Sequence, residues 1–139
     1  MNTPVSFKIS KLLNGKGFDL KTTAYYSGLN IYLDGVRFDY NDKTIESPTH
    51  KGNGGLYSSP TIAEVIMWLY EKYGIWIGVD CDCYGILWYA NLSVASEKNW
   101  DNIDLRHEII SASKKFPNEH NSPTEAYEAA LLYTLKNLI

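Results

Sequence analysis

The chain of 139 residues contains little cysteine, few clustered basic residues and no long apolar run. Its 2 cysteines are too few for a disulfide-held scaffold. It has 13 basic and 16 acidic side chains, and its only adjacent basic pair is Lys114 and Lys115. Because nucleic-acid binding depends on clustered lysine and arginine, we expect no nucleic-acid partner.

The apolar runs are also too short for a membrane span. The longest strongly apolar run, Val65 to Tyr70, falls far short of the roughly 20 residues that a spanning helix requires. Near the N-terminus, Lys8 and Lys11 interrupt the stretch in which a secretory signal would need apolar residues. We therefore expect a cytoplasmic protein with no membrane partner, whose cysteines are reduced thiols.

Aromatic residues are plentiful instead, since 4 Trp, 11 Tyr and 4 Phe make up 14% of the chain. With 45% hydrophobic and 21% charged residues, the composition is that of an ordinary globular protein. The length suits a single domain over residues 1–139. Aromatic rings supply much buried area, and rings left outside the core provide contact surface for a partner.

Three segments carry the sequence chemistry of a helix N-terminus, a Ser or Thr cap followed by Pro. Apolar residues follow each start at helical spacing, and Gly15 and Gly74 end the first two helices. In the third segment, a glutamate three residues after the serine completes a capping box. The three starts are Thr3-Pro4, Ser59-Pro60 and Ser122-Pro123-Thr124-Glu125.

Two segments allow a second interpretation. Val5, Phe7 and Ile9 alternate as in a strand, although we prefer the helix because Leu12 and Leu13 continue its apolar face. The stretch from Glu97 to Lys115 has apolar residues at helical spacing after Asp101, which allows a short helix there.

Asp34-Gly35 predicts the turn of a first β-hairpin, because Gly supplies the positive φ that such a turn requires. Closing the hairpin there separates an apolar face from a polar one. A third strand, Thr22 to Tyr26, is expected to join it through a Ser27-Gly28 turn. The predicted apolar face consists of Leu29, Ile31, Leu33, Val36, Phe38 and Tyr40.

The stretch from Asn41 to Ser58 has several glycines and few apolar residues, so we expect a long loop. Loops of this length are typically mobile or functional. His50 and Lys51 precede a glycine-rich run that lacks both the Gly-Lys-Ser/Thr sequence and the preceding strand of a phosphate-binding loop.

A second hairpin shows the clearest alternation in the chain. With a turn at Tyr84-Gly85, five apolar pairs from Cys83/Ile86 to Ile75/Val94 share one face. A tyrosine with positive φ is unfavourable, but a longer loop of the same parity leaves the faces unchanged. The reverse face carries Trp76, Gly78, Asp80 and Asp82 on one strand and Leu87, Tyr89, Asn91 and Ser93 on the other.

Because each hairpin has one apolar face, helices are needed to cover those faces. The sequence therefore predicts an α+β fold, an antiparallel sheet of four to five strands covered by about three helices in a two- or three-layer sandwich. Ala126, Ala129 and Ala130 give the last helix a surface of small residues that suits close approach to a sheet.

Three segments resemble known proteins, and they include Lys16-Gly17-Phe18-Asp19, Ser59-Pro-Thr-Ile-Ala-Glu and Ser122-Pro-Thr-Glu-Ala-Tyr. The segments Phe7 to Asp19, Ser59 to Ile77 and Ser122 to Ala130 are similar to small uncharacterised proteins encoded by phages and prophages of gut bacteria. Ser59 to Ile139 also resembles the phage ABA-sandwich domain. The resemblance implies an accessory protein of a mobile element in the cytoplasm of a bacterial host, and it implies no activity, cofactor or site residue.

The run Asp80-Cys81-Asp82-Cys83 does not predict a metal site. Strand alternation sends its thiols and carboxylates to opposite faces, so they do not converge on one ion. We expect the two cysteines to be buried thiols. Asp80 and Asp82 allow a catalytic carboxylate pair, although an acidic sheet face is more often simply hydrated.

Asp101, Asp104, His107 and Glu108 would lie on adjacent helical turns, where they allow a divalent metal site or an ordinary acidic helix start. We prefer the helix start. No complete motif for nucleophilic or metal-assisted catalysis is present, so we expect no catalytic residue, no metal and no cofactor.

The aromatic and acidic residues left outside the predicted core are the candidate binding residues. They are Trp68, Trp76, Asp80, Asp82, Tyr84 and Tyr89. Tyr and Trp are enriched in binding hot spots, so exposure of this surface favours contact with a partner, whereas a helix over it would bury the rings. Both arrangements remain open from the sequence.

The leading hypothesis is a non-enzymatic interaction module that contacts a protein partner or associates with itself. A small-ligand binder for a nucleotide-like ring is the alternative, with the glycine-rich loop near Lys51 closing over the ligand. A metal-dependent hydrolase is third, built on Asp80 and Asp82 or on the Asp101 to Glu108 cluster.

Overall fold

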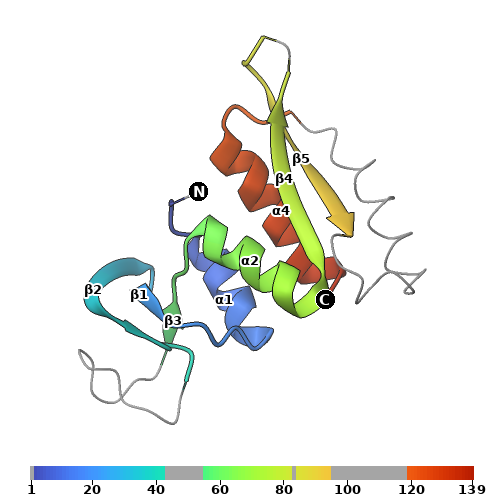
Figure 1. Cartoon of the computed structure of the whole chain (residues 1–139). Coiled ribbons are helices and arrows are strands. Elements are labelled where there is room, and N and C mark those ends of the chain that lie inside the picture. The colour runs from blue at the N-terminus through green and yellow to red at the C-terminus, as the bar shows by residue number, and fades with distance from the viewer. Residues whose placement is uncertain (1, 43–54, 83, 95–118) are drawn as a thin grey trace. The chain divides into compact units, whose positions relative to one another are not determined.

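A computed structural model describes residues 2–42, 55–82, 84–94 and 119–139 (Figure 1). Within these residues the chain forms three helices and five strands, and every strand pairing is antiparallel. The predicted α+β class is confirmed. The strands form two sheets, with orders β2-β1-β3 and β4-β5, and the chain divides into two compact units, Asn2–Thr61 and Ile62–Ile139.

The first unit begins with the predicted helix, α1 (Phe7–Gly15), but the predicted start at Thr3-Pro4 is wrong. Pro4 pairs with Thr61 in an isolated bridge, and the Val5 N–H donates to the Pro60 carbonyl at 2.9 Å. This pairing keeps the backbone extended up to Ser6, the N-cap residue. A long-range strand contact therefore overrides the local helix signal.

The first hairpin turns at a different place from the one that Asp34-Gly35 predicts. β1 (Thr22–Ser27) pairs with β2 (Asn30–Phe38) in a register that puts Ser27 opposite Asn30, and Asp34-Gly35 lies inside β2. The third strand expected from the sequence is thus the partner strand of the hairpin, and the turn contains Gly28 at a φ of 61°. The turn predicted at Asp34-Gly35 is wrong, because Gly28 supplies the positive φ that Gly35 was expected to supply.

Long-range aromatic packing explains why this register prevails. The Tyr25 ring stacks on Tyr40 with centroids 4.5 Å apart and on Tyr32 at 5.5 Å. The hydroxyl of Tyr26, on the other side of β1, donates to the Val5 carbonyl at 2.9 Å. Side chains on both sides of β1 therefore make contacts within this unit. These contacts favour the pairing of β1 with β2 over a hairpin closed at Asp34-Gly35.

The predicted apolar face of the first hairpin is consequently not a core face. Leu29 and Leu33 are 78% and 81% exposed, and Ile31 and Val36 are exposed as well. Only Tyr40 of that set is buried, with Phe38 packed against it. This expectation is wrong because the apolar alternation depended on the turn position.

The stretch predicted as a loop ends in a short strand, β3 (Leu56–Ser58), which pairs with β1. Leu56 and Ser58 are buried, and the Ser58 hydroxyl accepts a hydrogen bond from the Tyr40 N–H at 3.0 Å. The predicted loop is therefore wrong for these three residues. The glycine-rich run near Lys51 lies outside the described residues.

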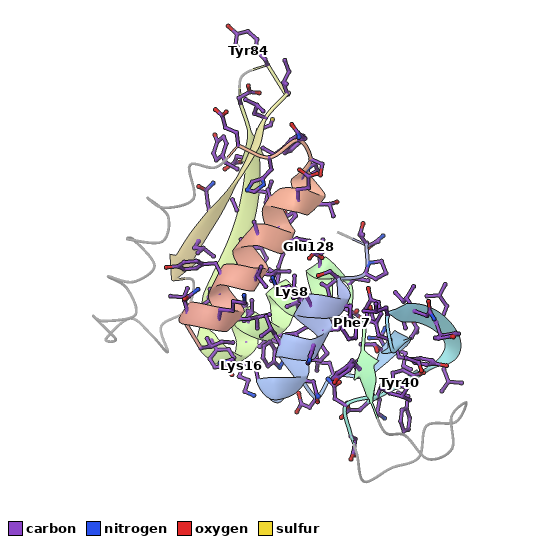
Figure 2. The ribbon with its side chains drawn as sticks, turned by 180° about the vertical axis from the view of Figure 1, so that it is seen from behind. Phe7, Lys8, Lys16, Tyr40, Tyr84 and Glu128 are labelled. Carbon is purple, nitrogen blue, oxygen red and sulfur yellow. The ribbon has the colours of Figure 1, made fainter. Side chains whose placement is uncertain are left out.

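The second unit consists of α2 (Ile62–Tyr73), β4 (Ile75–Cys81), β5 (Trp88–Val94) and α4 (Pro123–Asn137). Helix α4 lies along the β4–β5 hairpin, as Figures 1 and 2 show from opposite sides. The small-residue surface of α4 is confirmed in its main part, because Ala126 and Ala130 are completely buried.

The helix ends of this unit follow the sequence, but the predicted start of α2 at Ser59-Pro60 is wrong, because Thr61 pairs with Pro4 and the helix begins at Ile62. α2 starts two residues after Pro60 and ends before Gly74, whose φ is 68°. At the start of α4, the Ser122 hydroxyl accepts a bond from the Glu125 N–H at 3.2 Å. The serine half of the predicted capping box is thus confirmed, whereas the Glu125 carboxylate accepts from the Asn121 N–H, one residue before the cap, at 3.1 Å.

The register of the second hairpin is as predicted, from Ile75 opposite Val94 to Cys81 opposite Trp88. The Asp82 N–H continues the pairing by donating to the Leu87 carbonyl at 2.9 Å. The connection is thus a longer loop of the same parity, and Gly85 has its only positive φ among the described residues. The loop avoids the unfavourable positive φ at Tyr84.

The inner face of this hairpin, toward α4, is buried at its base and opens toward the loop. Ile75, Ile77, Ala90 and Leu92 are buried, whereas Cys81 is exposed. The expectation of a buried Cys81 thiol is wrong because the loop end of the hairpin extends beyond the first turn of α4 (Figure 2). Cys83 and the stretch predicted as a short helix, Glu97 to Lys115, are not among the described residues.

No helix within the described ranges has both the length and the apolar character that crossing a membrane requires.

Candidate functional site

The candidate site is the outer face of the β4–β5 hairpin, the side opposite its buried residues. The outer face consists of Trp76, Gly78 and Asp80 on β4 and Tyr89, Asn91 and Ser93 on β5. Trp76 is 38% exposed and Tyr89 is 37% exposed, and the side chains of Asp80 and Asn91 are also exposed. The sequence left open whether the rings of this face are exposed or are buried under a helix. In this part of the structure they are exposed.

Glycine occupies the centre of this face. The cross-strand pairs are Trp76/Ser93, Gly78/Asn91 and Asp80/Tyr89, so Gly78 lies in the middle row. A β-carbon built at Gly78 would meet, among the described residues, only the Trp76 Nε1 atom, at 4.0 Å. Apart from this ordinary contact with the indole N–H, the described residues leave the space above the Gly78 backbone open.

The Trp76 ring is held by a neighbour from α2. Tyr70 packs edge-on against it, with centroids 6.0 Å apart and ring planes at 89°. Edge-to-face geometry is favourable for aromatic pairs. The indole is therefore partly fixed in place before any partner arrives, which reduces the entropy lost on binding.

Asp80 places a carboxylate beside the open space. Its Oδ2 atom accepts a hydrogen bond from the Asn91 Nδ2 atom across the strands, at 2.6 Å. The remaining acceptor capacity of the carboxylate is available to a donor, since an ionised carboxylate has about four lone-pair sites.

Asp82, although predicted for the same surface, has a different role. Its Oδ1 atom accepts from the backbone N–H of Ile86 at 2.9 Å and of Leu87 at 3.3 Å. The hydrogen bond from Ile86, with further amides of the loop, lowers the pKa of the Asp82 carboxyl. Asp80 and Asp82 therefore have separate partners, and Asp82 stabilises the hairpin loop.

Trp68, predicted to lie near water, is buried with only 4% of its surface exposed. Tyr73 packs edge-on against its ring at 5.5 Å, and the Lys72 Nζ atom lies 5.1 Å from the ring centroid. The predicted exposure of Trp68 is wrong because residues four and five positions further along the chain cover the ring. It does not contribute to the outer face.

Tyr84 is 82% exposed in the hairpin loop, away from the rows of the outer face (Figure 2). Of the six candidate binding residues, the structure thus brings together Trp76, Asp80 and Tyr89. It leaves Tyr84 at the loop end, gives Asp82 a loop contact and buries Trp68.

The charge around this face is negative. In Ile62–Ile139, acidic side chains outnumber basic ones, whereas basic side chains are in excess in Asn2–Thr61. None of the six outer-face residues is basic. In the described part of the second unit, the basic residues are Lys72 and Lys136, and the acidic ones are Glu64, Glu71, Asp80, Asp82, Glu119, Glu125 and Glu128.

A second exposed surface was missed from the sequence. Leu29 in the turn and Ile31 and Leu33 on the edge strand β2 are all exposed. Large exposed apolar patches often mark interaction sites. The signal that could have identified it is the tyrosine-rich strand before Gly28, whose rings compete with these aliphatic residues for the core.

The structure brings no group of three or more His, Cys, Asp and Glu side chains together for a metal within the described ranges. The predicted alternative cluster of Asp101, Asp104, His107 and Glu108 lies outside those ranges, as does His50.

Comparison of the chain with protein-family models, with curated proteins and with solved structures finds no match. The resemblance to phage-encoded proteins and to the ABA-sandwich domain therefore stays an expectation based on the residues quoted above.

Proposed function

We propose that this protein is a non-enzymatic interaction module that binds a protein partner through the outer face of β4–β5. The observation that carries the proposal is the grouping of Trp76, Tyr89 and Asp80 around Gly78 on an accessible sheet face. Exposed aromatic rings on a rigid strand pair are typical of binding hot spots, because they bury a large area at little cost in side-chain entropy.

The packing of the hairpin supports this role. Its inner face is buried, with Ile77 and Leu92 in the core, and α4 lies along it. The outer rings therefore lie on a hairpin whose buried core is on the opposite face. In line with the resemblance, we place the protein among phage- or prophage-encoded accessory proteins that act in the cytoplasm of a bacterial host.

Charge favours a different protein over a second copy on this face. Two copies that met through their outer faces would bring Asp80 carboxylates toward each other in an acidic surrounding. Like charges brought together in an interface are unfavourable. A partner that carries positive charge meets no such penalty.

Capture from a bacterial host lysate by the immobilised full chain tests the proposal. We expect a partner to be retained by the wild type and lost on Trp76→Ser and on Tyr89→Ser. Leu29→Ser, which removes an apolar side chain that is 78% exposed on the other unit, is the matched control and should retain it. Capture that survives both outer-face substitutions contradicts the proposal.

Two further measurements separate the alternatives. Concentration-dependent light scattering detects self-association, and its loss on Trp76→Ser would identify a second copy as the partner. A nucleotide that binds only the folded state raises the melting temperature, which would favour the small-ligand alternative. For the hydrolase alternative, metal-dependent activity lost on Asp80→Asn would be the minimum support.

A further inference from the structure

We infer that the outer face receives an arginine side chain of its protein partner, with the guanidinium over Gly78 between Trp76 and Asp80. This inference rests on the proposed function and specifies the chemistry that the partner presents. It is carried by the position of Gly78, by the groups that border it and by the charge of the surrounding unit.

Within the described residues, neither backbone conformation nor crowding at the β-carbon position requires a glycine at position 78. Its φ is not among the positive values, so an L-residue can adopt this backbone. The space at its β-carbon position has one described neighbour, the Trp76 Nε1 atom, at the ordinary contact distance of 4.0 Å. A glycine inside a strand weakens the strand, and one recognised reason for it is the close approach of a ligand or of another chain.

The groups around Gly78 fit a planar cation. Trp76 and Tyr89 offer aromatic rings, and Asp80 offers a carboxylate that Asn91 orients at 2.6 Å. Guanidinium stacks on aromatic rings and forms directed hydrogen bonds with carboxylates. The compact, strongly hydrated ammonium of lysine lacks the planar stacking surface, so arginine fits this face better.

The site lacks a cation of its own among the described residues. Lys72, the nearest basic residue in sequence, lies over Trp68 and Tyr73. Lys136 belongs to the last turn of α4, on the other side of the hairpin. Among the described residues, no basic side chain is thus placed beside the Asp80 carboxylate, and a cation from the partner would match its charge.

A titration of the ¹⁵N-labelled full chain with short peptides tests the inference. The probes are acetyl-Gly-Arg-Gly-amide and the same peptide with citrulline, which keeps the shape of arginine but removes its charge. Of the indole N–H signals in the spectrum, we expect the arginine peptide to shift that of Trp76 in a saturable way. Citrulline should bind at least about tenfold more weakly, the scale of a cation–π contact and an ion pair together.

Matched variants locate the cation. Asp80→Asn should weaken the arginine effect, whereas Asp82→Asn, the same change in a loop-stabilising carboxylate, should leave it unchanged. Gly78→Thr should abolish the shift by filling the space, and urea unfolding should show that its fold is retained. Equal shifts with arginine and citrulline, no saturable shift, or a shift that survives Gly78→Thr overturns the inference.

Failure of the inference and failure of the proposed function give different results. If partner capture depends on Trp76 but no arginine-specific shift is seen, the proposed interaction module is supported and the inference of a partner arginine is contradicted. Capture that is independent of Trp76 removes the proposed function itself.

Discussion

Trp88 and His120 exchange two backbone hydrogen bonds, from the Trp88 N–H to the His120 carbonyl at 2.9 Å and from the His120 N–H to the Trp88 carbonyl at 2.8 Å. Trp88 also faces Cys81 on the other side, so β5 is paired along both edges at this point. The pairing lies two residues before Ser122, the N-cap of α4. It therefore ties the beginning of the helix to the hairpin on which the helix lies.

The first prediction concerns this pairing. His120→Pro removes the N–H donor and leaves the Trp88 carbonyl without its partner, which should lower the free energy of unfolding by about 1–3 kcal/mol. His120→Ala keeps both backbone bonds and serves as the control. Urea unfolding of both variants measures the difference, and equal stabilities would show that the pairing contributes nothing.

The capping box of α4 gives a second prediction. Ser122→Ala removes the hydroxyl that accepts from the Glu125 N–H, and it should lower the free energy of unfolding by about 1 kcal/mol. Thr124→Ala, in the same helical turn but not at the cap, should stay within about 0.5 kcal/mol of the wild type. Thermal unfolding monitored by circular dichroism compares the two, and a larger loss for Thr124→Ala would refute the cap assignment.

The hairpin at Gly28 predicts contrasting effects of two leucine truncations. Leu33→Ala removes a side chain that is exposed, so it should change the free energy of unfolding by less than about 0.5 kcal/mol. Leu131→Ala in α4 removes a completely buried side chain and should cost about 2–5 kcal/mol. Were the hairpin closed at Asp34-Gly35 instead, Leu33 would be buried and its truncation would cost a comparable amount.

Two aspartates should affect acid stability in opposite directions. Hydrogen bonds led by the one from the Ile86 N–H lower the pKa of Asp82, so its carboxylate favours the folded state above the ordinary carboxyl range. That contribution is lost as the pH falls through the lowered pKa of the folded state. Asp82→Asn should therefore be less stable than wild type at pH 7, and the deficit should vanish below the lowered pKa of the folded state.

Asp39 provides the opposite sign. Burial raises its pKa, with the charges of Asp42 and Asp19 adding to the effect, against hydrogen bonds from Asn41 and Asp42. The charged carboxylate therefore disfavours the folded state above the raised pKa, and this penalty is absent below the ordinary carboxyl range. Asp39→Asn should be more stable than wild type at pH 7. Urea unfolding between acidic and neutral pH should show the two variants on opposite sides of the wild type.

The candidate site could be predicted where strand alternation alone decides which way a side chain points. Trp76 and Asp80 share the outer face because alternate residues of a strand lie on the same side, and Tyr89 joins them because the loop keeps the parity that pairs it with Asp80. Trp68 could not be placed this way. Its burial depends on Lys72 and Tyr73 folding over the ring, which is a matter of side-chain conformation.

The amino-acid sequence by itself determined the helix at Ser122, the helix before Gly74 and the register and faces of the second hairpin, because each depends on chemistry within a few residues. Only the tertiary structure decided where the first hairpin turns, since both Gly28 and Gly35 satisfy a turn locally. The choice between them followed from packing Tyr25 against Tyr40, residues far apart in the chain. Likewise, only the tertiary structure showed that Trp76 Nε1 is the one described atom near the β-carbon position of Gly78, because the space around a residue is a property of the folded surface.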